Sequence, residues 1–355
     1  MFNIPFFNKN KNALGIDIGS SSIKIIEVSF DKGQVNLVNY GEKIIPINKA
    51  DVSSGNAIDS VFSSSSGIGE AIKDVIKKAG IKTKDATLSI PSFMSFFTVF
   101  TAPPMSKEEV KTVVQFEAKQ HIPMPLSEVA LDWSIIEEGS TGKGPKILLV
   151  AVPNRTIDQY QEISQVAGIN LLAVEAEVFS LARSVIQEPD IAKTVLLVNI
   201  GFQNTTIAVV ENGLIKSTYN TNFSVMDIIK HLATKLGIEY NEAEKLIMEI
   251  GFSDEKLSSV LSSKINILTS ETKQVADSFS RSYRRSVEKI ILTGGFALIP
   301  GVCEFFTKNT GIPTELANSF SKINYDPSLN KVINEMNSRY AVALGLAIRE
   351  FKKIK

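Results

Sequence analysis

Cysteine and histidine are nearly absent from this chain of 355 residues, which has one cysteine, Cys303, and two histidines. A single thiol cannot close an internal disulfide, so we expect a reducing compartment. The chain also has too few such ligands for a structural zinc site. Neither sign of charge is in excess, with 38 Lys+Arg against 38 Asp+Glu, which argues against nucleic acid as a partner. No apolar run reaches the roughly 18 residues of a membrane span, so membrane contact is expected only through partners. The apolar residues 1–7 are followed rather than preceded by lysines, the reverse of a signal peptide, and their role is left open.

What the chain does contain is an early glycine- and serine-rich turn between two apolar runs, at residues 13–28. The β-branched runs predict two strands joined by a hairpin turn. Gly19 allows the backbone to bend or to approach a ligand closely. Lys24 adds positive charge to a turn whose amides and hydroxyls suit an anion, those of Ser20, Ser21 and Ser22. Asp17 precedes the turn, where a carboxylate suits a hydrated metal ion better than a bare phosphate. The simpler interpretation is an ordinary hairpin.

A second stretch, residues 195–210, repeats this pattern: an apolar run leads to Asn199, then Gly201, a polar turn and another apolar run. Two such copies predict a duplicated fold whose loops face each other. A third apolar run, at residues 289–293, ends in a pair of glycines. In their order and spacing the three stretches resemble the two phosphate loops and the adenosine loop of the actin-like ATPase superfamily. The resemblance implies an α/β, actin-like (ribonuclease H-like) fold duplicated into two domains.

Residues 96–168 interrupt the first half of this pattern. They are predicted to form strand, helix, strand and strand, followed by a further helix that ends at Gly168. Such an inserted subdomain resembles the FtsA and PilM branch of the superfamily, and residues 102–105, 117–119 and 122–125 are more similar to the PilM family of type IV pilus assembly proteins. The expected division is a first half-domain at 13–95 and 169–190, the inserted subdomain at 96–168, a second half-domain at 191–337 with a helical part at about 224–285, and a closing helix at 338–355.

The resemblance implies roles for residues in all three loops. The β- and γ-phosphates of ATP would be held by Gly19, Ser20, Ser21, Ser22 and Lys24, and Mg²⁺ would be held through water by Asp17 and Asn199. The second loop would close the site with Gly201, Phe202, Gln203, Asn204 and Thr205. The adenosine would be lined by Gly294, Gly295 and Phe296, with Glu244 and Lys245 near the ribose. The place where relatives orient the attacking water would be taken by Glu177, or else by Glu175.

Three departures from the family pattern argue against fast hydrolysis. Asn199 stands where relatives usually have aspartate, which removes one carboxylate from the metal shell. Phe223 lies in a segment where two glycines are expected, and Ile247 stands where many relatives have lysine. We therefore expect a nucleotide-binding scaffold whose ATP hydrolysis is slow or absent.

The resemblance also implies a partner, the short cytoplasmic N-terminal peptide of a PilN-like inner-membrane protein, alongside other pilus platform components. The family's peptide groove lies between the inserted subdomain and the first half-domain, which points to Phe97, Val99, Val113, Phe116 and Glu117. Phe116 lies roughly 120° off the apolar stripe of a helix predicted at residues 106–121, so it either meets a partner or packs within the subdomain. The chain would be cytoplasmic and peripheral to the inner membrane. An FtsA-like cell-division adaptor is the alternative, a small-molecule kinase is disfavoured, and self-association is left open.

Overall fold

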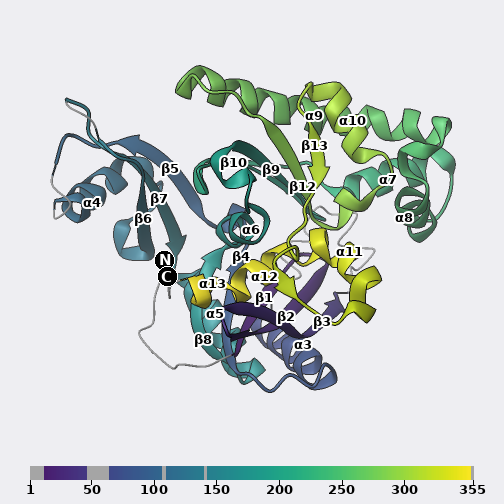
Figure 1. The fold of residues 1–355 in the computed structure, drawn as a ribbon, viewed down its shortest axis with the longest axis horizontal. Helices are drawn as coiled ribbons and strands as arrows, with labels where there is room; N and C mark the ends of the chain where they lie inside the picture. Colours follow the sequence, from purple (N-terminus) through teal and green to yellow (C-terminus); the bar gives the residue numbers. More distant parts are fainter. Residues whose placement is uncertain (1–11, 46–63, 106–108, 140–141, 353–355) are drawn as a thin grey trace.

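Two sheets that share the order of five strands, the first with one strand added at its edge, form the centre of the structure (Figure 1). The structure is a computed structural model that describes residues 12–45, 64–105, 109–139 and 142–352. The apolar residues 1–7 and the start of the predicted helix at Ser106 lie outside the described residues. Among the described residues, none of the helices combines the length and the apolar character that a membrane crossing requires.

The first sheet has the order β14-β3-β2-β1-β4-β8 and the second the order β11-β10-β9-β12-β13. In each sheet the first three strands of the chain pair antiparallel, and the next two join in parallel. This repeated order confirms the duplicated α/β fold. The first sheet comprises β1 (Asn12–Ile18), β2 (Ser22–Asp31), β3 (Gln34–Ile44), β4 (Asp85–Ile90), β8 (Asn170–Ala176) and β14 (Ile323–Asn324). The second comprises β9 (Thr194–Ile200), β10 (Thr205–Glu211), β11 (Leu214–Thr221), β12 (Lys289–Thr293) and β13 (Thr314–Leu316).

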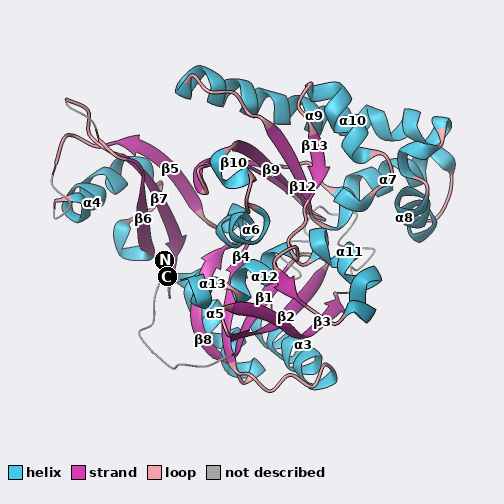
Figure 2. Cartoon of the chain, viewed as in Figure 1, coloured by secondary structure: helices cyan, strands magenta, loops and turns pink. Residues whose placement is uncertain are grey.

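The inserted subdomain is a third sheet with the order β5-β7-β6 and an α-helix packed on it (Figure 2). Its elements are β5 (Phe96–Thr101), α4 (Val110–His121), β6 (Val129–Glu137) and β7 (Lys146–Pro153). Side chains alternate between the faces of a strand. Accordingly Ile147 and Leu149 pack under α4, whereas Leu148 and Val150 face a core shared with the second half-domain. Lys216 of β11 is 3% exposed and donates a hydrogen bond to the carbonyl of Ile136, which joins the subdomain to the second sheet.

Helix α5 (Asn154–Ala167) packs with α3 (Ser65–Lys78) on the first sheet. Its apolar side chains, Tyr160, Ile163 and Ala167, share the core of β1 and β4 rather than that of the inserted strands. The sequence-based boundary at Gly168 assigns this helix to the insert. Because its packing is with the first half-domain, we propose Pro153 as the end of the inserted subdomain.

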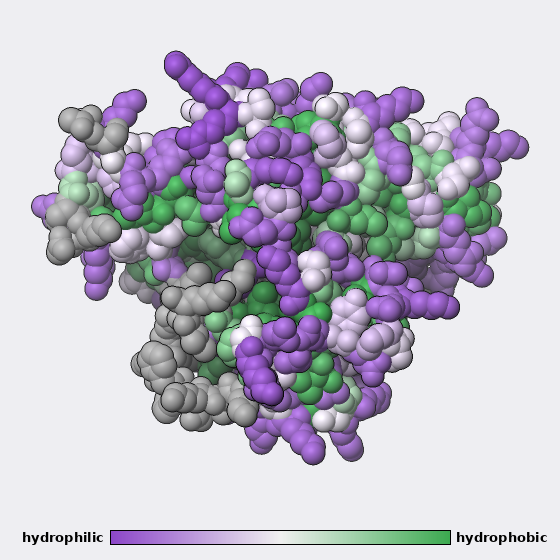
Figure 3. All heavy atoms as spheres, in the orientation of Figure 1, coloured by the Kyte–Doolittle hydropathy of each residue, from purple (hydrophilic) through white to green (hydrophobic). Residues whose placement is uncertain are grey.

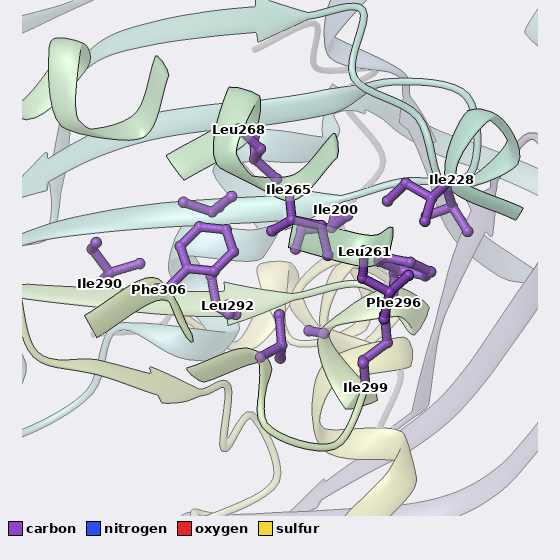
Figure 4. Packing of buried hydrophobic residues seen from close by; sticks show 14 of the residues in the cluster. Ile200, Ile228, Leu261, Ile265, Leu268, Ile290, Leu292, Phe296, Ile299 and Phe306 are labelled. Atoms are coloured by element: carbon purple, nitrogen blue, oxygen red, sulfur yellow. The ribbon is translucent and has the colours of Figure 1, made fainter. Parts of the chain in front are cut away.

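The second half-domain has its helices over one face of its sheet, namely α7 (Val225–Leu236), α8 (Tyr240–Glu249), α9 (Glu255–Tyr283) and α10 (Val302–Thr310). Helix α9 begins at Glu255, where Asp254 caps it by accepting a hydrogen bond from the Leu257 amide at 2.8 Å. Figure 4 shows the core under these helices. On the face seen in Figure 3, hydrophilic side chains project around the edge of the molecule, with hydrophobic residues visible between them.

The C-terminal part returns to the first half-domain as three short helices rather than one, α11 (Asn330–Arg339), α12 (Ala341–Ala347) and α13 (Arg349–Lys352). Every residue of α12 is buried, between β1 and α6 (Glu177–Val185). Two glycines permit this contact. A Cβ at Gly345 would lie 1.8 Å from the carbonyl oxygen of Ser180, and one at Gly15 would lie 1.9 Å from that of Ala343.

Candidate functional site

The first candidate loop joins β1 to β2 through a four-residue turn. The Gly19 amide donates to the carbonyl of Ser22 at 3.0 Å, and the Ser21 carbonyl accepts from the Ile45 amide at 2.9 Å. Lys24 Nζ donates to Ser22 Oγ at 2.6 Å. The positive charge predicted for this loop is therefore held beside the turn.

The second loop joins β9 to β10 and has the same geometry. The Gly201 amide donates to the Asn204 carbonyl at 3.0 Å, the counterpart of the Gly19 bond. Helix α7 starts directly on this loop, where the carbonyl of Phe202 accepts from the Met226 amide at 3.1 Å. The register makes Asn199 the counterpart of Asp17 and Thr206 the counterpart of Lys24. The two turns are thus structural repeats as well as sequence repeats.

Several side chains of the second loop do not face a ligand. The rings of Phe202 and Phe223 pack against the core of the second half-domain. Thr205 is fully buried and donates to the Phe223 carbonyl at 3.0 Å. Gln203 differs: both polar atoms of its amide are buried and have no hydrogen-bond partner among the described residues. Burying such atoms costs free energy, which favours a polar group or water arriving there.

Asp17 is 9% exposed at the end of β1 and accepts a hydrogen bond from Ser89 Oγ at 2.8 Å. Burial raises the pKa of the Asp17 carboxyl, while the Lys24 charge and the Ser89 hydrogen bond act in the opposite direction. A cation at this position would favour the charged carboxylate. Within the described ranges no three His, Cys, Asp or Glu side chains gather as a metal cage. Mg²⁺ usually keeps several waters and takes one or two carboxylates together with substrate phosphates, so the residues present fit that ion.

The structure separates the two glutamates that the sequence left as alternatives. Glu177, at the start of α6, accepts hydrogen bonds at 3.2 Å from the Ser92 amide of the first half-domain and from Thr206 Oγ1 of the second. Burial and, to a lesser extent, the charge of Asp17 raise the pKa of Glu177 to about 7. A carboxyl group with that pKa can accept and release a proton at neutral pH.

Glu175 is 4% exposed and belongs to a different environment. Its oxygens lie 2.8 Å from Arg183 Nη1 and 2.9 Å from Arg349 Nε. Successive strand residues point to opposite faces, and β8 carries Glu175 to the face covered by α12. Glu175 is thus bound in a buried ion-pair cluster, and Glu177 alone is placed between the half-domains.

The third loop follows β12. Gly294 has a φ of 91°, and a Cβ there would meet the Ile200 carbonyl at 2.4 Å and Asn199 Oδ1 at 3.0 Å. The loop is held from the other side by the Ser338 carbonyl, which accepts from the Gly294 amide at 3.1 Å. A Cβ at Gly295 would meet nothing within 4 Å, so this position is open to a ligand.

The remaining nucleotide candidates are placed less favourably. Phe296 is 4% exposed, and its ring lies in the core of the second half-domain, as Figure 4 shows. Only its main chain is available to an adenosine. Glu244 and Lys245 are exposed on α8, where Lys245 Nζ lies 3.9 Å from Glu249 of the next turn.

Four of the five partner candidates are half-buried, and Phe116 is exposed. Phe97 and Val99 pack against the core shared with α6, and the Phe97 ring centroid lies 6.2 Å from that of Phe179. Val113 packs against the core under α4. Phe116 is 63% exposed, and Glu117 lies beside it, 3.7 Å from His121. The structure therefore leaves Phe116 as the exposed aromatic of this set.

Sequence reasoning did not identify the residues that hydrogen-bond to the predicted site carboxylates or pair with their neighbours. Ser89, Ser92 and Thr206 hydrogen-bond the two carboxylates, and Arg339 reaches Glu42 from a segment 297 residues later in the chain. For Thr206 a signal existed, because it is the repeat counterpart of Lys24. For Arg339 the sequence has none.

Comparisons with known proteins agree with this arrangement. FtsA, the cell division protein of Enterococcus faecalis, is 20% identical over an alignment 389 positions long, which covers 93% of this chain and 86% of FtsA. FtsA of Streptococcus pneumoniae is 22% identical, covering 85% of this chain and 74% of its own length.

Solved structures show the same fold. A PilM–PilN type IV pilus biogenesis complex matches with a TM-score of 0.81 and 21% identity over 96% of this chain and 99% of the matched chain. MreB5 of Spiroplasma citri bound to AMPPNP matches with a TM-score of 0.51 and 13% identity over 98% of both chains. These neighbours have the actin-like ATPase fold. The family model described as type IV pilus assembly protein PilM matches residues 15–351. That match spans both half-domains and the inserted subdomain, and the chain therefore belongs to the PilM family of type IV pilus assembly proteins.

Proposed function

We propose that the chain is a cytoplasmic nucleotide-binding scaffold of a type IV pilus or a related secretion or DNA-uptake machine. The observation that carries the nucleotide part is the pair of repeated turns, each closed by a glycine amide donating to the carbonyl three residues later at 3.0 Å. The half-domains that carry these turns touch at Glu177. A solved relative, MreB5, is bound to AMPPNP in one structure and to ADP in another, which supports an adenine nucleotide.

In this proposal ATP binds between the two turns, where Lys24 and the turn amides neutralise phosphate charge. Mg²⁺, when bound with the nucleotide, supplies further neutralisation of the phosphates, and Asp17 holds its water shell. Gln203 provides a buried side-chain amide whose nitrogen and oxygen can both hydrogen-bond to the nucleotide or its water. The adenosine contacts the open side of Gly295 and the main chain of Phe296. Glu177 is positioned to orient a water molecule, but the second acid of the metal shell is replaced by Asn199, so turnover is slow or absent.

Replacing Lys24 by alanine is expected to weaken binding of Mg-ATP at least about tenfold, because a charge-assisted phosphate contact contributes roughly 1.5–3 kcal/mol. Isothermal titration calorimetry on both proteins measures the loss. Lys43→Ala is the matched control and is expected to leave the ATP affinity unchanged. Lys43 follows the residue opposite Lys24 on the neighbouring strand β3, and it pairs with Asp74 at 3.0 Å. Equal affinity in wild type and Lys24→Ala would rule out the assigned phosphate site.

The second part of the proposal is that the inserted subdomain binds the cytoplasmic N-terminal peptide of a PilN-like inner-membrane protein. The support is membership of the PilM family and the match to a PilM–PilN complex. This partner would place the chain at the inner membrane and beside other platform components. The match of the PilM family model to residues 15–351 favours pilus assembly over cell division. Phe97 and Val99 are occupied by internal packing, so the exposed face of α4 around Phe116 and Glu117 is the proposed contact.

Replacing Phe116 by alanine is expected to cost about 2 kcal/mol or more of peptide binding, as buried aromatic anchors do. The melting temperature should stay nearly unchanged, because the side chain is 63% exposed and contributes little to the core. Ile267→Ala, a truncation at a 51% exposed position on α9, is the control for loss of surface hydrophobicity. Fluorescence anisotropy with a PilN-like peptide and a thermal melt give the two quantities. Unaltered peptide affinity, or a melting temperature lowered as by a core truncation, would exclude the anchor.

A further inference from the structure

Four charged side chains of alternating sign form a row beside the first turn. The register pairs Asp17 of β1 with Lys24 of β2, and Lys24 in turn with Glu42 of β3. Directly opposed residues on neighbouring strands have their side chains on the same face, so these three groups are neighbours. Arg339, the last residue of α11, completes the row from a distant part of the chain.

The distances show how the charges are shared. Arg339 Nη2 donates to both oxygens of Glu42, at 2.9 Å and 2.7 Å. Lys24 Nζ lies 3.7 Å from Glu42 Oε1 and donates instead to Ser22 Oγ at 2.6 Å. Exposure of these three side chains is low, 13% for Lys24, 19% for Glu42 and 33% for Arg339, so solvent screens them only in part.

The carboxylates of Asp17 and Glu42 both lie beside Lys24, so a bound phosphate would have to compete with them for the charge of this lysine. An unneutralised Glu42 would draw Lys24 towards β3 and would repel an incoming phosphate. The Arg339 guanidinium satisfies both oxygens of Glu42, and a carboxylate held in this way competes less for the lysine. Lys24 is then left at the turn.

The residue before Arg339 contacts the other side of the site. The Ser338 carbonyl accepts hydrogen bonds from Thr293 Oγ1 at 3.0 Å and from the Gly294 amide at 3.1 Å. Two adjacent residues at the end of α11 therefore act on two loops. Ser338 holds the third loop, and Arg339 holds Glu42 beside Lys24 of the first loop.

We infer that Arg339 is a positioning residue for the phosphates of the bound nucleotide: it neutralises Glu42 and so keeps Lys24 available at the first turn. The inference rests on the nucleotide-binding function proposed above. It concerns the phosphates alone, because Arg339 acts through Lys24 and not on the base.

The experiment compares ATP and adenosine binding in five proteins, namely the wild type, Lys24→Ala and the three variants below, by displacement of a fluorescent adenine nucleotide, with a thermal melt of each. Arg339→Gln is expected to lose roughly tenfold in affinity for ATP, by loss of a charge-assisted contact at Lys24, and to bind adenosine as the wild type does. Glu42→Gln is expected to bind ATP several-fold more tightly, since it removes a negative charge beside the phosphates. The double variant Arg339→Gln/Glu42→Gln is expected to recover the wild-type ATP affinity.

A purely structural role for Arg339 predicts a different pattern, in which adenosine binding falls with ATP binding and the double variant does not recover. That pattern overturns the inference and leaves the proposed function standing. The same holds if Arg339→Gln binds ATP with wild-type affinity while Lys24→Ala still binds it weakly. Failure of the wild type to bind ATP, or of Lys24→Ala to weaken it, overturns both. If Arg339→Gln does not fold, Glu42→Gln alone decides: unchanged or weaker ATP binding contradicts the inference.

Discussion

Replacing Glu175 by alanine is expected to lower the free energy of unfolding by about 3–5 kcal/mol, because it removes the carboxylate that two arginines share in a buried ion-pair cluster. Glu175 is 4% exposed, and Arg349, which it pairs with at 2.9 Å, is 3% exposed. Arg183 loses the same carboxylate, at 2.8 Å. Urea denaturation at neutral pH measures the change.

Glu177→Gln is the matched control, and at neutral pH it is not expected to lower the free energy of unfolding as Glu175→Ala does. The pKa of Glu177 is raised to about 7 from an ordinary value of 4.5, so the folded wild-type protein binds a proton more readily than the unfolded chain. Wild-type stability should therefore decline as pH rises from about 4.5 to about 7, and the glutamine variant should lack this part of the decline. Equal loss of stability in Glu175→Ala and Glu177→Gln would contradict the division into a structural and a site glutamate.

Replacing Gly345 by alanine is expected to destabilise the protein by about 3 kcal/mol or more, at the upper end of overpacking costs. The added Cβ would lie 1.8 Å from the carbonyl oxygen of Ser180 and 2.4 Å from its carbon. Both are backbone atoms of α6, so α6 and α12 would have to separate. Alanine gains roughly 1 kcal/mol over glycine in helix propensity, which is too little to offset the clash.

Gly67→Ala tests the same substitution where the clash is absent. Gly67 is exposed in α3, and its Cβ would meet only the side chain of Ser64, at 3.3 Å. Stability should be unchanged or slightly raised by the better propensity of alanine. If thermal melts show Gly345→Ala to be as stable as Gly67→Ala, α6 and α12 do not pack as closely as described.

The turns were predictable because their cause is local. Gly19 and Gly201 stand between short apolar runs, and the repeat of that pattern indicated the duplication before any contact was known. Side-chain direction was harder. Phe296 follows the glycine pair of the third loop, as a ligand-lining residue would, but its ring is 4% exposed in the core.

The choice between Glu175 and Glu177 also lay beyond sequence reasoning. It depends on β8 ending at Ala176, which puts the two side chains in different environments, and strand ends are the least certain feature of a pattern. The pairing of Glu42 with Arg339 joins residues 297 positions apart, and no local signal links them. The first turns of helix α9 give little apolar signal because they are mostly polar, with Leu257, Leu261 and Ile265 as the buried stripe.

The return of the C-terminal helices to the first half-domain sets an order of events during synthesis. Ala13 and Val28 share one core with Ala343, Leu344 and Phe351, and the rings of Phe30 and Phe351 stack with centroids 5.3 Å apart. The first strands leave the ribosome early but cannot bury this face until α12 and α13 have been made. At roughly 5–20 residues per second, that delay lasts on the order of 15–60 seconds. The second half-domain has its own helices over its sheet and can complete that core first, so we expect this protein to finish folding at its N-terminal half.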